Sequence, residues 1–123
     1  MSAVQVVNVD DVEPTELPRG SWSRMLVTRS RVEGNHASLG YSVFTPGTVL
    51  ADVCHEAEEV AYVVAGIGEL RLEGELVPFA KGDALFIPPG VWHAVANTGA
   101  EDVVMVFGFA HPEYPPTERR SPA

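Results

Sequence analysis

A chain of 123 residues has room for one hydrophobic core and is too short for two domains. Hydrophobic residues make up 46% of the chain and charged residues 20%, which is typical of a globular protein. The formal net charge is −9 and no stripe of basic residues exists, so electrostatic repulsion argues against a nucleic-acid partner.

The chain begins with a candidate strand at residues 4–9, followed by a proline-containing loop at residues 10–20. From residue 22 to residue 110, short apolar or β-branched runs recur about every ten residues, separated by glycine, proline and asparagine. This pattern predicts an all-β sandwich or barrel. The proline-rich segment 112–123 is predicted to be an extended tail. The predicted strands cover residues 22–30, 37–44, 49–55, 59–65, 69–72, 76–79, 84–87, 92–96 and 103–110.

Residues 55–62 fit two interpretations. The residues at the start of this segment are good helix formers, which permits a helix. The β-branched run at 60–64 instead favours a turn at residues 56–58 followed by a strand, and we prefer this interpretation. Both interpretations bring His55 and Glu59 close together.

Two segments carry polar residues at a distinctive spacing. In the first, Gly47 is followed by His55, Glu59 and Gly66. This spacing resembles the first motif of the cupin superfamily, whose pattern contains two histidines, a glutamate and two bounding glycines. Val53 occupies the position of the first of those histidines, so this chain departs from the pattern at one metal-ligand position.

The second segment contains Gly82, Pro88, Gly90, His93 and Asn97. This spacing matches the complete second cupin motif, and fifteen residues separate the two segments, as in compact microbial cupins. The resemblance implies a single-domain protein over residues 1–123, with one cupin (jelly-roll) barrel at about 22–110. It does not imply one function, because this fold supports many chemistries.

The resemblance implies that His55, Glu59 and His93 converge on one metal ion. Two imidazoles and one carboxylate suit a divalent first-row ion, so Fe, Mn, Ni or Zn is expected, and open coordination positions remain for substrate or dioxygen. Strand alternation places Val53 on the same face as His55 and Cys54 on the opposite face. Because Val53 removes one ligand, the site is either an open three-ligand centre or one that has lost its metal.

The leading functional hypothesis is a metal-dependent enzyme that acts on a small organic substrate, as a dioxygenase, lyase, isomerase or cyclase. Glu59 and His93 are the candidate catalytic residues. One alternative is a non-catalytic, small-molecule-binding cupin with a degenerate metal site. Another is a metal-free acid–base epimerase or isomerase that uses the same three residues. Candidate substrate-binding residues lining the barrel are Tyr41, Val53, Tyr62, Phe86 and Phe107.

The expected assembly is a homodimer, in which the strand at residues 4–9 is a candidate for exchange between subunits. Cys54 is the single cysteine, so no internal disulfide is possible. The sequence contains no signal-peptide pattern and no apolar run of membrane-spanning length. We therefore expect a cytoplasmic protein without a membrane partner.

Overall fold

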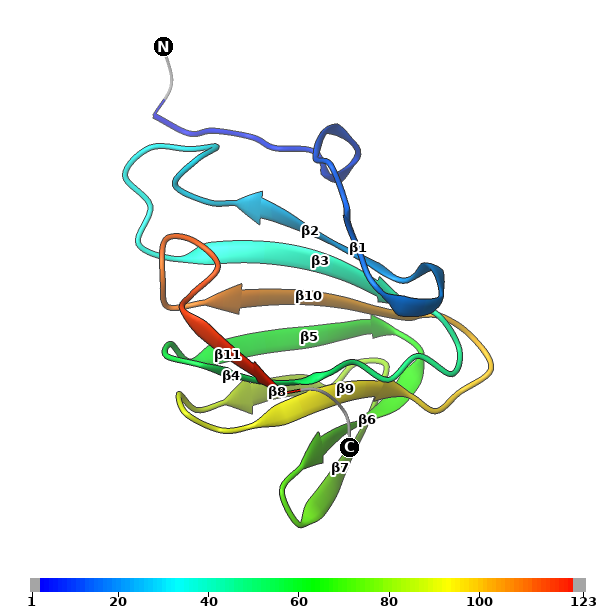
Figure 1. Ribbon diagram of the computed structural model, residues 1–123. Coiled ribbons are helices and arrows are strands. Elements are labelled where there is room, and N and C mark those ends of the chain that lie inside the picture. The colour runs from blue at the N-terminus through cyan, green and yellow to red at the C-terminus, as the bar shows by residue number, and fades with distance from the viewer. Residues whose placement is uncertain (1–2, 121–123) are drawn as a thin grey trace.

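The fold consists of two antiparallel sheets that face one another, in a computed structural model that describes residues 3–120 (Figure 1). We call them sheet A and sheet B. Sheet A has the order β1 (Thr15–Glu16), β2 (Trp22–Val27), β3 (Ser38–Phe44), β10 (Val103–Phe109), β5 (Glu59–Ala65), β8 (Ala84–Ile87). Sheet B has the order β11 (Thr117–Arg120), β4 (Asp52–His55), β9 (His93–Asn97), β6 (Ile67–Leu72), β7 (Glu75–Ala80). The all-β prediction is confirmed.

The core lies between the two sheets, because alternate residues of each strand face inward. In β5, for example, Ala61 and Val63 are buried while their neighbours are exposed. In β3, Gly40 lies against the ring of Phe107, and a Cβ atom at Gly40 would collide with that ring. The buried core comprises Phe44, Ala61, Val63, Leu70, Phe79, Ile87, Val103, Met105, Phe107 and Phe109.

The segment at residues 4–9 forms no strand, so this prediction is wrong. Residues 4–8 have no regular structure, and a short 3-10 helix, η1 (Val9–Asp11), follows them. The side chain of Asn8 caps this helix by accepting a hydrogen bond from the backbone N–H of Asp10. Val4 and Val6 are 77% and 90% exposed. Residues 4–8 lie outside both sheets, so these two side chains do not pack into the core.

The C-terminal segment also differs from the prediction of an extended tail at 112–123. Residues 111–114 bend back across the domain, and β11 then pairs with β4 along the edge of sheet B. The reason is that the backbone N–H and C=O groups along the edge of β4 would otherwise be unpaired, and β11 supplies their hydrogen-bond partners. Residues 121–123 lie outside the described part of the chain.

Among the described residues, no helix is long and apolar enough to cross a membrane.

Candidate functional site

The ends of three strands bring His55, Glu59 and His93 together. His55 ends β4, the bend at residues 56–57 follows, and Glu59 begins β5 in the opposite sheet. The turn interpretation of residues 55–62 is therefore confirmed. His93 begins β9, directly after the turn that contains Gly90. Gly90 has a φ of +80°, which favours glycine, and its N–H donates to the carbonyl of His55 at 2.9 Å.

The ligand atoms of these side chains converge on one point between the sheets. Oε1 of Glu59 lies 3.3 Å from Nε2 of His55 and 3.4 Å from Nε2 of His93. One ligand atom from each residue lies within 4.8 Å of the others. The two histidines are buried, with 5% and 4% of their surface exposed. The structure thus brings together all three residues that the sequence selected.

The electrostatics of this cluster favour a charged Glu59–His93 pair. Burial raises the pKa of Glu59, but hydrogen bonds and charge from the two histidines outweigh it, so the pKa lies below its usual value. Burial lowers the pKa of His93, but its hydrogen bonds to Glu59 and Val91 and the charges of Glu59 and Asp52 together outweigh this effect, so the pKa is raised. Glu59 is therefore ionised at neutral pH, and His93 holds its proton more tightly than an ordinary histidine.

The outer nitrogen of each ring is hydrogen-bonded away from the cluster. Nδ1 of His93 donates to the carbonyl oxygen of Val91 at 2.9 Å. Nδ1 of His55 lies 2.7 Å from the hydroxyl oxygen of Thr117 in β11. These contacts fix both ring planes and direct both Nε2 atoms toward Glu59.

Aromatic rings form one wall of the site. Phe109 meets the ring of His55 edge-on at 4.9 Å between centroids, and Tyr114 does so at 5.5 Å. Tyr114 also packs edge-on against Phe109 at 5.4 Å. Burial raises the pKa of the Tyr114 hydroxyl, which keeps the phenol neutral. Tyr114 therefore places a neutral phenol from the C-terminal segment beside His55.

Tyr114 and Thr117 were missed by the sequence reasoning. Both lie in the segment predicted as an extended tail, between or beside Pro112, Pro115 and Pro116. Prolines normally argue against a paired strand, and neither residue belongs to a motif. The available signal was a short strand-compatible run at 117–120, which needed a free edge to pair with.

Two of the five predicted substrate-binding residues face the interior. Val53 pairs with His93 across sheet B, so both side chains lie on the same face. Phe107 is buried and packs edge-on against Phe109 at 5.7 Å between centroids, which places it one ring further from His55.

The other three predicted substrate-binding residues face outward, and for them a place in the barrel interior is wrong. Tyr41 stacks on Trp22, at 5.9 Å between ring centroids, on the outer face of sheet A. Tyr62 and Phe86 are 51% and 61% exposed. Strand alternation is the reason, because each lies next to buried residues that already occupy the inner face.

Comparisons with known proteins agree with this architecture. A family model described as a cupin domain matches residues 40–109. The chain is 35% identical over 104 residues to a protein of Streptomyces cyaneus named polyketide synthase CurC, covering 84% of this chain and 67% of CurC. It is 33% identical over 67 residues to a gentisate 1,2-dioxygenase of Ralstonia sp., covering 54% of this chain and 19% of that enzyme.

Among solved structures, the polyketide cyclase RemF of Streptomyces resistomycificus superposes with a TM-score of 0.80 at 21% identity. The superposition covers 98% of this chain and 87% of RemF. At this identity the likeness establishes the fold, and it extends over both sheets.

Proposed function

The chain belongs to the cupin family, and on that premise we propose that it is a metal-dependent enzyme acting on a small organic substrate. His55, Glu59 and His93 are the proposed metal ligands. The observation that carries this proposal is the convergence of two Nε2 atoms and one carboxylate oxygen in a buried space.

The distances from the Glu59 carboxylate to the two histidines fit a first-row ion. Ligands bound at about 2.1 Å to one ion lie roughly 3.0–3.4 Å apart in octahedral or tetrahedral geometry. The separations of 3.3 and 3.4 Å from Glu59 fall in that range. The donor types suit Fe, Mn, Ni or Zn, and the position next to Val53 offers no fourth side-chain ligand.

Within the enzyme class, we propose a cyclase-type reaction on a polyketide-like substrate. CurC matches 84% of this chain, whereas the gentisate dioxygenase matches 54%. A divalent ion supplies Lewis acidity that polarises a substrate carbonyl when it is bound. The chain would contribute the apolar wall of Phe109 and Tyr114, which excludes water, and the carboxylate of Glu59, which would hold and return a proton.

Metal analysis tests the proposal. Protein purified without chelator should contain a stoichiometric first-row metal, and His93→Ala should lose it because one of three ligands is gone. His36→Ala is the matched control, since His36 is an exposed histidine outside the cluster and its loss should leave the metal content unchanged. Full activity in a metal-free preparation would overturn the metal-dependent assignment.

The same protein can also be used to test two alternative functions, because Val53 occupies the position of a missing metal ligand. A chain that binds metal only after Val53→His would be a binding cupin with a degenerate site rather than a metalloenzyme. Activity that survives chelators and has a bell-shaped pH profile would identify the metal-free acid–base reaction, for which the charged Glu59–His93 pair is the supporting observation.

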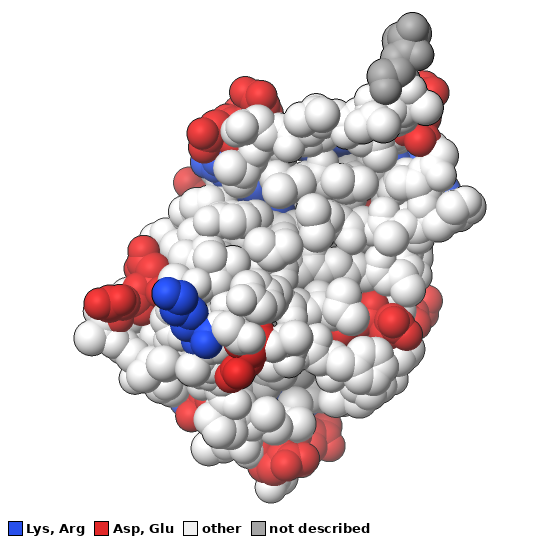
Figure 2. Space-filling view, turned by 180° about the vertical axis from the view of Figure 1, so that it is seen from behind, with Lys and Arg blue, Asp and Glu red and all other residues white. Residues whose placement is uncertain are grey.

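We further propose that the chain forms a homodimer through the outer face of sheet A. That face carries exposed apolar side chains from three strands, β3, β5 and β8, and Figure 2 shows a broad surface on that side without charged groups. Apolar patches of this kind mark association surfaces. The exposed members are Leu39, Val60, Tyr62, Val64 and Phe86.

A further inference from the structure

β11 delivers a single hydroxyl group to the outer side of one proposed metal ligand. Thr117 pairs directly with His55 in the antiparallel register of β11 and β4. Its Oγ1 atom lies 2.7 Å from Nδ1 of His55 and 2.8 Å from the carbonyl oxygen of Pro115. The hydroxyl therefore connects the imidazole to the backbone of the C-terminal segment.

The direction of these hydrogen bonds determines the tautomer of His55. A hydroxyl has one proton to donate, and a carbonyl oxygen can only accept. Thr117 therefore donates to Pro115 and must accept from the Nδ1–H group of His55. With a proton held on Nδ1, Nε2 is the ring nitrogen that faces Glu59 and would give up its proton to bind an ion.

His93 keeps its Nδ1 proton through a different contact. Its Nδ1–H group donates to the carbonyl oxygen of Val91, two residues earlier in its own segment. His55 depends instead on a residue 62 positions later in the chain. The orientation of His93 is thus set by its own segment, whereas the orientation of His55 requires β11 to be paired with β4.

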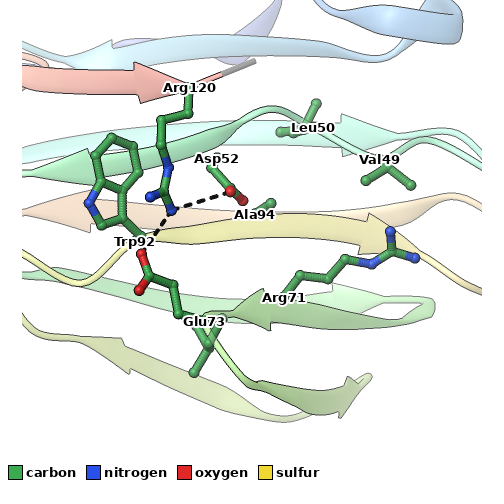
Figure 3. A pocket seen from close by; sticks show the side chains of 9 residues that line it. Val49, Leu50, Asp52, Arg71, Glu73, Trp92, Ala94 and Arg120 are labelled. Atoms are coloured by element: carbon green, nitrogen blue, oxygen red, sulfur yellow. Dashed lines mark hydrogen bonds and ion pairs between the residues drawn. The ribbon is translucent and has the colours of Figure 1, made fainter. Parts of the chain in front are cut away.

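A cluster at the far end of β11 holds this strand in register. Figure 3 shows Arg120 between Trp92, Asp52 and Glu73, in a groove on the outer face of sheet B. The guanidinium lies 3.8 Å from the centroid of the Trp92 ring. It also lies 3.0 Å from the carboxylate of Glu73 and 3.4 Å from that of Asp52. At the near end, the N–H of Glu56 donates to the carbonyl of Pro116 at 3.1 Å.

We infer that Thr117 is a positioning residue for the metal site: its hydroxyl accepts from Nδ1–H of His55 and so directs Nε2 into the site as the ligand atom. This inference rests on the proposed function for its consequence in metal binding. The tautomer itself is a property of the metal-free protein and can be measured without an ion.

Thr117→Val and Thr117→Ser separate the hydroxyl from the shape of the side chain. Valine keeps the branched shape and strand preference but cannot accept a hydrogen bond, so Nδ1–H loses its partner. We expect Nδ1 to lose its proton while Nε2 keeps the proton that Glu59 accepts. Loss of an outer hydrogen bond of this kind weakens metal affinity by about 10–100-fold. Serine keeps the hydroxyl and should restore both the tautomer and the affinity.

The two measurements are ring-nitrogen NMR of the metal-free protein, which reports whether Nδ1 of His55 carries a proton, and zinc affinity by chelator competition. Glu118→Gln is the control, because Glu118 is exposed on the same strand. An unchanged Nδ1–H tautomer in Thr117→Val would overturn the inference. Equal loss of zinc affinity in Thr117→Ser and Thr117→Val would also overturn it, since the hydroxyl would then be irrelevant. A parent protein that binds no zinc contradicts the proposed function, while the NMR result still decides the role of Thr117.

Discussion

At the scale of single residues, the cluster combines a carboxylate that is easily ionised with a histidine that keeps its proton. The contacts of Glu59 with both imidazoles offset the cost of burying its carboxylate, and its hydrogen bond is the largest of the contributions that raise the pKa of His93. A metal ion needs the lone pair on Nε2 of His93, which is the atom that faces Glu59.

Metal binding should therefore release a proton from His93. Below the raised pKa of His93 the ring is protonated and competes with the metal, and above it the ring is free to bind. We expect zinc affinity to increase as pH rises from 6 to 8. Calorimetry in buffers of different ionisation enthalpy measures the proton released. The same affinity at both pH values, with no proton release, would contradict this assignment of the proton.

At the scale of elements, β11 connects the site to the outer surface of sheet B. The Arg120 cluster is partly exposed, so its cation–π contact and ion pairs together contribute about 0.5–1 kcal/mol. That amount is too small to hold the domain together, but it is large enough to change how often a terminal strand detaches.

Arg120→Met should loosen β11 without unfolding the domain. We expect faster amide hydrogen exchange at residues 117–120 and a smaller loss of zinc affinity than in Thr117→Val, because the hydroxyl remains but its position is less restricted. Arg71→Met is the control: Arg71 lines the same groove, and its ion pair is with Glu69 rather than with β11. Equal exchange rates in both variants would show that the cluster does not hold the strand.

The strands of the fold and the three central site residues could be predicted because local patterns encode them. Short runs with turn residues between them gave β5 and β8 with the bounds that the structure has. His55 and Glu59 were predictable because only a turn separates them. Thr117 was not, because its position depends on strand pairing between residues far apart in sequence. The sequence did not show that Tyr62 points outward, because that requires knowing that its neighbours Ala61 and Val63 occupy the inner face.

At the scale of the whole molecule, the apolar outer face of sheet A is the surface that a second copy would cover. Phe86→Glu places a charge on that face, and we expect it to shift the protein toward monomer in light scattering at micromolar concentration. Leu76→Glu is the matched control, because Leu76 is 60% exposed on β7 of the other sheet. A parent protein that is monomeric under these conditions would refute the dimer.

The proposed ligands come from both sheets: Glu59 begins β5 of sheet A, while His55 and His93 belong to β4 and β9 of sheet B. An ion held by all three would act as a cross-link between the two layers. Separating the layers would then require the ion to leave, so its binding free energy would add to the free energy of unfolding. At a free-ion concentration 100 times the dissociation constant, this contribution is about 2.7 kcal/mol. Occupancy of the site and resistance of the fold to heat would rise and fall together.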